Sequence, residues 1–96
     1  MREITDGSII QAVKEQVSCN LAGESVILNL KSGQYYGLDP VGARIWRLIQ
    51  EPKGFNDVRD AILQEYDVAA DIAERDLMAL LKDLQANELI DVANDE

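Results

Sequence analysis

The hydrophobic pattern of this chain changes its period at Asp39-Pro40, and this change constrains the fold more than any other feature of the sequence. Before this point apolar and polar residues alternate, which is typical of half-buried strands. After it, apolar residues recur at the spacing of an amphipathic helix. Strands followed by helices, in a chain of 96 residues, predict one α+β domain.

Three strands are predicted in the first part of the chain. Apolar and polar residues alternate over 17–21 and again over 26–30. A Gly-containing loop at 31–33 then leads into a third strand over 34–38. Because the connections are short, these strands are expected to form a three-stranded antiparallel β-meander.

The two ends of the chain are expected to contribute little to the core. Residues 1–13 show no clean period and are predicted to be a flexible arm, and residues 91–96 are predicted to be a solvated tail. Cys19 lies on the apolar face of the first predicted strand, which predicts an inert packing residue. Residues 1–96, including the arm and the tail, are predicted to form a single domain.

Three α-helices are predicted after the strands. The first has Asp39 as its N-cap and ends before Pro52. The second covers about 56–67, and the third begins at a capping box that starts with Asp71 and runs to about Asn87. A meander followed by three helices has the outline of a winged helix-turn-helix.

The sequence offers no catalytic or metal-binding constellation. It contains no histidine and a single cysteine, so neither an imidazole base nor a Cys/His zinc site is possible. Its carboxylates follow amphipathic helices and are explained as solvated faces. We therefore predict that the chain is not an enzyme and binds no metal or cofactor.

Net charge narrows the possible partners. The chain has 18 acidic and 9 basic residues, a net charge of -9, which opposes nucleic acid and anionic membranes. The predicted third helix, which would read the DNA groove in a winged helix, is itself acidic. No apolar run resembles a signal peptide or a membrane span, which predicts a cytoplasmic protein. A neutral or mildly basic peptide remains a compatible partner.

The third predicted strand is the candidate binding feature. It consists of Gln34, Tyr35, Tyr36, Gly37 and Leu38, and a meander leaves one row of its backbone groups unpaired. It contains no charge and no proline, the usual devices that keep a foreign strand from docking. A peptide could add there as a fourth strand, or the third helix could cover the edge; the pattern alone allows both.

The central segment carries a specific motif. Gly-x-Tyr-Tyr-x-Leu over 33–38 is followed, after three residues, by Gly-x-x-Ile-Trp over 42–46. With the strand before it and the apolar spacing of the later helices, this segment resembles the PqqD family, whose members include recognition elements of lasso-peptide and other modified-peptide pathways. The resemblance covers about 14–92. Many relatives place Gly before the final apolar pair, whereas this chain has Asn87-Glu88, and Asn tolerates the same left-handed cap.

The resemblance implies a winged helix-turn-helix that binds the leader segment of a ribosomally made precursor peptide. The leader would lie antiparallel to the third strand, in a groove formed with the third helix, and would be delivered to a leader peptidase and then a cyclase. Besides the strand residues, one flank of the third helix is favoured as groove lining, with Met78 on the opposite flank left as the alternative. The favoured residues are Asp76, Leu80 and Asp83.

Two other functions remain open at this level. One is an acidic winged-helix regulatory protein, and the other is a structural subunit of a larger complex with a permanently covered edge strand. In all three cases Trp46 is expected to fill core space, and Gly42 to let the first helix approach the sheet.

Overall fold

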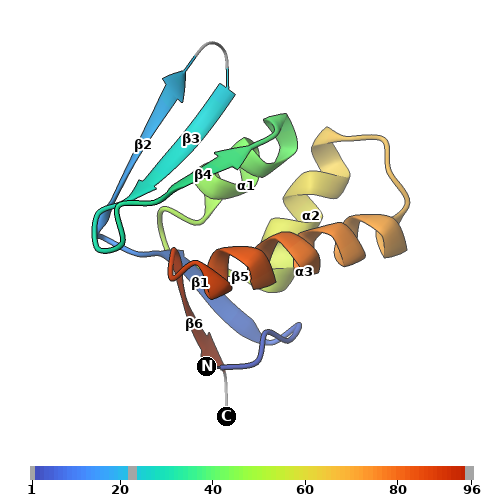
Figure 1. Ribbon diagram of the computed structural model, residues 1–96. Coiled ribbons are helices and arrows are strands. Elements are labelled where there is room, and N and C mark those ends of the chain that lie inside the picture. The colour runs from blue at the N-terminus through green and yellow to red at the C-terminus, as the bar shows by residue number, and fades with distance from the viewer. Residues whose placement is uncertain (1, 22–23, 95–96) are drawn as a thin grey trace.

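The computed structural model describes residues 2–21 and 24–94, which contain six strands and three helices (Figure 1). The strands form two three-stranded antiparallel sheets, ordered β5-β1-β6 and β2-β3-β4. The class is α+β, as predicted, but the strands do not form a single three-stranded meander. The elements are β1 (Ser8–Ala12), β2 (Gln16–Leu21), β3 (Glu24–Asn29), β4 (Tyr35–Leu38), α1 (Pro40–Leu48), β5 (Lys53–Gly54), α2 (Phe55–Glu65), α3 (Ala70–Ala86) and β6 (Ile90–Asn94).

The β5-β1-β6 sheet corrects the predicted arm and tail. β1 lies within the predicted arm and pairs along its whole length with β6, which occupies most of the predicted tail. β5 pairs with the other edge of β1. Residue 1 of the arm and residues 95–96 of the tail lie outside the described residues. Both ends of the described chain are therefore held in one sheet.

Burial explains why this first strand forms. Ile10 is 0% exposed, and Ala12 and Ile90 are also buried, so apolar contacts stabilise the pairing of β1 with β6. The alternation was hidden by the adjacent apolar pair Ile9-Ile10, of which Ile9 is 42% exposed. A run of two apolar residues has no visible period even when only one of them faces the core.

The β2-β3-β4 sheet contains the three predicted strands in their predicted order. β2 pairs with β3, and β3 pairs with β4 from Ser25 opposite Leu38 to Leu28 opposite Tyr35. α1 packs against β3 and β4 on the inner face of this sheet. The outer face has no helix against it in Figure 1.

The faces of β2 are the reverse of those predicted. The Trp46 indole N–H donates to the Ser18 hydroxyl at 2.7 Å, so the polar side of β2 faces α1. Val17 is 49% exposed, and Cys19 is exposed rather than packed, so the interpretation of Cys19 as a buried residue is wrong. A buried indole needs a hydrogen-bond acceptor, and that need places serine on the inner face.

The start of α1 agrees with the sequence prediction. The Asp39 carboxylate accepts a hydrogen bond from the Gly42 N–H at 2.7 Å, and Pro40 occupies the first helical position. A Cβ atom at position 42 would lie 3.3 Å from a Leu38 methyl group. Glycine there allows α1 to begin directly against the end of β4.

The predicted capping box of α3 does not form. The helix starts at Ala70, with Ala69 as an N-cap that makes no side-chain hydrogen bond. Asp71 therefore lies in the first turn, where its charge is favourable near the helix N-terminus. The high helix propensity of the preceding alanines accounts for the earlier start.

The end of α3 is a Schellman motif. The Leu89 N–H donates to the Leu84 carbonyl at 2.9 Å, and the Glu88 N–H donates to the Gln85 carbonyl at 3.0 Å. Glu88 has φ of 57°, whereas Asn87 has φ of -92°. The left-handed residue is therefore Glu88, and the expectation that Asn87 would adopt this conformation is wrong.

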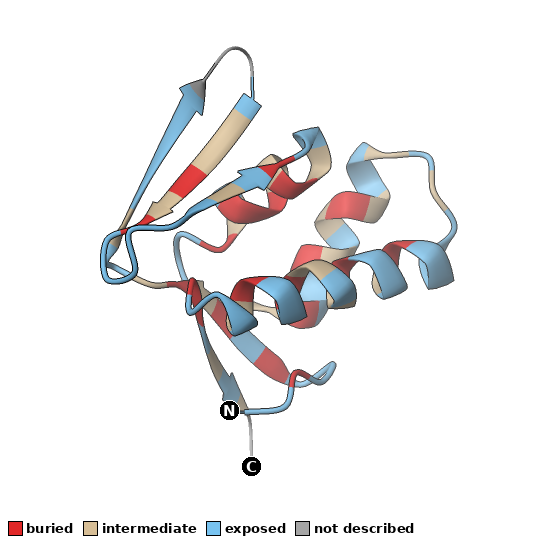
Figure 2. Cartoon of the chain, viewed as in Figure 1, coloured by how far each residue is buried: buried red, intermediate tan, exposed pale blue. Residues whose placement is uncertain are grey.

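One core joins the helices to both sheets (Figure 2). Its largest side chains include Trp46 from α1, Phe55 from α2 and Leu81 from α3. α2 contacts β1, and α3 contacts β6 and α2. None of the helices in the described ranges is long and apolar enough to cross a membrane.

Candidate peptide-binding groove

β4 is an edge strand with one open side. It pairs with β3 on one side and is last in the order β2-β3-β4. Its four residues, Tyr-Tyr-Gly-Leu, include no charged residue and no proline. A strand of this kind presents unpaired backbone N–H and C=O groups that another strand can bind.

The register decides which backbone groups of β4 point outward. The Asn29 N–H donates to the Gln34 carbonyl at 2.9 Å, so this opposed pair is hydrogen bonded. In an antiparallel ladder such pairs alternate with non-bonded ones. Tyr36 and Leu38 therefore bond β3, while the backbone groups of Tyr35 and Gly37 point to the open side.

The two tyrosines lie on opposite faces of the sheet, as predicted. Tyr35 is 66% exposed on the outer face. Tyr36 is half-buried on the inner face, where burial and then the neighbouring Asp83 carboxylate raise its pKa. The Tyr36 side chain therefore lies near Asp83 of α3. This proximity places the inner face of β4 next to α3.

The side of α3 that was predicted to line the groove lies beside a stripe of buried leucines on the same helix. Leu77, Leu81 and Leu84 form the stripe and are at most 2% exposed. Asp76 and Asp83 are exposed and Leu80 is half-buried, and all three lie at helical spacing on one side of that stripe. Met78, on the opposite flank, packs against the core cluster.

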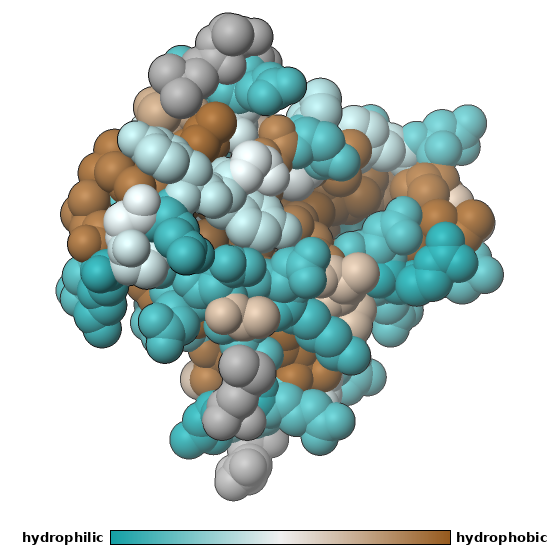
Figure 3. Space-filling model, in the orientation of Figure 1, coloured by the Kyte–Doolittle hydropathy of each residue, from teal (hydrophilic) through white to brown (hydrophobic). Residues whose placement is uncertain are grey.

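An apolar pocket continues from this flank. It has a volume of about 420 Å³ and lies between the start of α1, the end of α2 and the first half of α3. Asp39 and Asp76 are its only charged lining residues among those described. In Figure 3, apolar surface lies between more polar atoms in this part of the molecule. The pocket suits a side chain with a large apolar body. Its apolar lining includes Val41, Ile45, Ile62, Tyr66, Val68, Leu77 and Leu80.

The structure brings together most, but not all, of the residues expected at the site. Tyr36 and Asp83 adjoin each other, and Asp76 and Leu80 line the pocket. Leu38 is buried at the end of β4, and a Cβ atom at Gly37 would meet no atom within 4 Å. Gln34 precedes β4 and lies in the turn, and the Tyr35 side chain points away from α3. The backbone of Gln34 is already bonded to Asn29, and Tyr35 offers its outward backbone groups, so neither side chain lines the groove.

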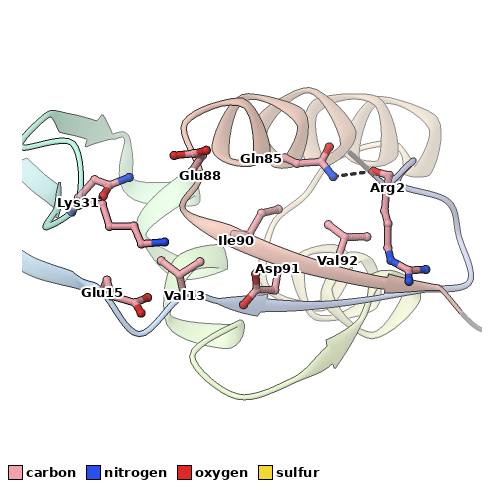
Figure 4. Close-up of a pocket in the computed structure, with 10 residues that line it drawn as sticks. Arg2, Val13, Glu15, Lys31, Gln85, Glu88, Ile90, Asp91 and Val92 are labelled. Carbon is pink, nitrogen blue, oxygen red and sulfur yellow. Dashed lines mark hydrogen bonds between the residues drawn. The ribbon is translucent and has the colours of Figure 1, made fainter.

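A second cavity, of about 750 Å³, lies elsewhere (Figure 4). It is bounded by the C-terminal end of α3, β6 and the turn before β4, and none of its lining residues belongs to β4. Charged side chains of both signs line it, with Lys31 and Glu88 near one end and Arg2 near the other. It cannot hold a strand added to β4, so we place the candidate site at the β4–α3 groove. Among the described residues, no cluster of His, Cys, Asp and Glu could hold a metal ion.

A protein-family model described as "Coenzyme PQQ synthesis protein D (PqqD)" matches residues 24–90. The chain belongs to the PqqD family. The matched segment includes β4 and all of α3, so both sides of the groove lie within the PqqD region, whereas β1 and β2 lie outside it. No curated protein matches the chain.

Two solved structures are similar to this PqqD-family chain. One is TbiB1 in complex with the TbiA(beta) leader peptide, with 41% identity, coverage of 84% of this chain and 94% of that chain, and a TM-score of 0.76. The other is a lasso peptide synthetase B1 complexed with the leader peptide, with 27% identity, coverage of 84% and 95%, and a TM-score of 0.74.

Sequence reasoning missed two groups that line the pocket of this PqqD-family domain. Asp39 was assigned only as a helix cap, although it directly follows Leu38 and therefore had to lie at the end of the edge strand. Tyr66 was predicted only to lie near the end of the second helix. Its position at the last turn of that helix, next to the connection to α3, is the signal that could have placed it beside the groove.

Proposed function

We propose that the chain binds the leader segment of a ribosomally made precursor peptide by adding it as a fourth strand to β4. The observation that carries this proposal is the open, uncharged edge of β4 beside α3. The leader would lie antiparallel to β4, bonded through the outward backbone groups of Tyr35 and Gly37. Side chains of alternate leader residues would point toward α3.

Two further observations support this function. The apolar pocket at the C-terminal end of β4 provides a place for a leader side chain, since strand addition derives its specificity from such pockets. Asp76, Leu80 and Asp83 on α3 would contact the same peptide, with the carboxylates suiting basic or hydroxyl-bearing side chains. The two similar solved structures are complexes with leader peptides.

We also propose the pathway step that follows binding. In a lasso-type pathway the bound leader is presented to a leader peptidase and then to a cyclase, and the domain itself contributes recognition without catalysis. The absence of histidine from the sequence supports this division of labour. The chain would act in the cytoplasm, where precursor peptides are made, as a single leader-recognition domain of the winged helix-turn-helix type.

Direct titration tests the function. A fluorescently labelled leader from a neighbouring precursor gene should bind with a dissociation constant of roughly micromolar to tens of nanomolar, as expected for a small interface. The protein alone should leave the peptide intact, as followed by mass spectrometry. A folded protein that binds no such leader would contradict the proposal and favour the structural-subunit alternative.

A proline scan tests the mode of binding, because proline has no N–H and is excluded from paired strand positions. Tyr35→Pro and Gly37→Pro remove outward N–H groups and should abolish leader binding with little loss of thermal stability. Tyr36→Pro removes a bond to β3 and should unfold the domain. If both outward variants fold and bind the leader normally, the peptide does not add to β4.

A further inference from the structure

Asn29, the last residue of β3, is an unusual polar residue in this fold. It is 3% exposed, and Ser8 is the other buried polar residue among those described. A buried carboxamide is costly unless its donor and acceptor groups are all bonded. Asn29 bonds both its side-chain oxygen and its side-chain nitrogen, through contacts with two separate parts of the chain.

The side chain bonds the turn on one side and α3 on the other. Its Oδ1 accepts hydrogen bonds from the Lys31 N–H at 2.9 Å and from the Ser32 N–H at 3.2 Å. Its Nδ2 donates to the carbonyl of Asn87, the C-cap of α3, at 2.9 Å. Two N–H donors and one carbonyl acceptor leave a single possible orientation of the amide.

The main chain of Asn29 extends the same network. Its N–H donates to the Gln34 carbonyl at 2.9 Å, and its carbonyl accepts from the Gly33 N–H at 2.8 Å. Gln34 is the residue immediately before β4. One residue therefore connects β3, the turn that delivers β4, and the C-terminal end of α3.

These bonds lie at the narrow end of the groove. In Figure 1, the start of β4 and the C-terminal end of α3 approach each other where the turn lies, and the two elements separate toward α2. Tyr36 and Asp83 lie near each other farther along the groove. The Asn29–Asn87 bond thus fixes the distance between the two walls at the point where they meet.

We propose that Asn29 is a positioning residue that presets the separation of β4 and α3 for the incoming leader. This inference rests on the proposed function. A strand added to β4 must lie about 4.8 Å from it while its side chains reach α3, so both walls must be held at a defined distance. If β4 and α3 already lie at this distance in the free protein, binding avoids the free-energy cost of ordering α3.

Asn29→Asp separates the two halves of the amide. The carboxylate keeps the acceptor for Lys31 and Ser32, but it cannot donate to Asn87 and instead faces a carbonyl oxygen. The turn should therefore survive while the link to α3 is lost. We expect leader affinity to fall about fivefold, the change that corresponds to one lost hydrogen bond of average strength.

Ser8→Ala is the matched control. Ser8 is buried and hydrogen bonded to the Thr5 N–H and to Asn94, but it lies in the β5-β1-β6 sheet, away from the groove. Its loss should lower stability and leave leader affinity unchanged. Affinities are compared at a temperature well below the unfolding midpoints of all three proteins.

A second readout monitors the groove in the free protein. NMR cross-peaks between the Tyr36 ring and Asp83 should weaken in Asn29→Asp and persist in Ser8→Ala, which a purely stabilising role of Asn29 would not produce. A folded Asn29→Asp protein that keeps these cross-peaks and binds the leader with wild-type affinity would overturn the inference. Absence of leader binding by the wild-type protein would instead contradict the proposed function.

Discussion

Glu88 shows at the scale of one residue how this fold accepts local strain. It is the only described residue other than glycine with a positive φ, and a side chain with a Cβ atom is disfavoured in that conformation. The surrounding bonds explain why the conformation persists. Leu89 must turn back to bond Leu84 and enter the core, where it is 1% exposed.

Glu88→Gly should therefore stabilise the protein. Glycine adopts a positive φ without a steric cost, and part of this gain is offset by its greater freedom in the unfolded chain. We expect the free energy of unfolding to rise by about 0.5–1 kcal/mol, measured by urea denaturation. Glu88→Ala removes the same charge while keeping the Cβ atom, so it should give no comparable gain. Equal stabilisation by both variants would trace the effect to charge instead.

Side chains on α3 should contribute less to leader affinity than the backbone hydrogen bonds to β4. Leu80→Ala and Asp76→Ala each remove a groove contact while leaving the backbone ladder intact, so each should weaken binding by about 1 kcal/mol. Met78→Ala on the opposite flank is the control, with unchanged affinity in the same titration. Weaker binding by Met78→Ala alone would place the peptide on the other side of α3.

At the scale of elements, β1 is the clearest case of a segment whose role depends on distant parts of the chain. Its partners, β5 and β6, are formed by residues 53–54 and 90–94. Ile10 lies in the core between them, while its neighbour Ile9 points outward. These two isoleucines offer a comparison within one strand.

Ile10→Ala should cost about 3 kcal/mol of stability, because it leaves a cavity in a fully packed site. Ile9→Ala, which changes the same number of atoms at an exposed position, should cost less than about 1 kcal/mol. Thermal unfolding followed by circular dichroism measures both. Similar small losses for the two variants would mean that β1 is only loosely attached.

The elements also show how much of the fold could be predicted from the sequence. Local signals were sufficient for the central strands, for the capped start of α1 and for the helical spacing of α3, because turn residues and hydrophobic period can be recognised from neighbouring residues. β1 and β6 were missed because each is short and is stabilised by a partner more than 70 residues away. The inner face of β2 was assigned wrongly because Trp46, on a later helix, requires the serine.

Only part of the groove could be predicted from the sequence, for the same reason. The edge strand could be predicted from its lack of charge and proline, and the flank of α3 from its spacing. The contact between Tyr36 and Asp83, and the bond from Asn29 to Asn87, join positions that have no relation in the sequence. Only the packing of α3 against the rest of the fold reveals them.

At the scale of the whole molecule, the net charge of -9 limits which partners can bind strongly. Backbone pairing in a partly apolar groove is nearly independent of ionic strength, whereas contacts between exposed charges are screened. Leader affinity should therefore change by less than about threefold between low and moderate salt. Fluorescence anisotropy at several salt concentrations measures this, and a steep loss would show that charge holds the peptide.

The same charge predicts no binding to duplex DNA, even at low salt, where attraction to phosphates is strongest. A gel shift at low ionic strength is a sufficient measurement. A shifted band would favour the regulatory winged-helix alternative over leader recognition.

The pairing of β1 with β6 has a consequence for protein engineering. Ser8 lies opposite Asn94, so the chain enters and leaves the fold at neighbouring points. In Figure 1 these points are at the far end of the molecule from the β2-β3-β4 sheet. The domain could therefore be inserted into a surface loop of another protein through both ends, where it would be anchored at two adjacent points and β4 would face outward.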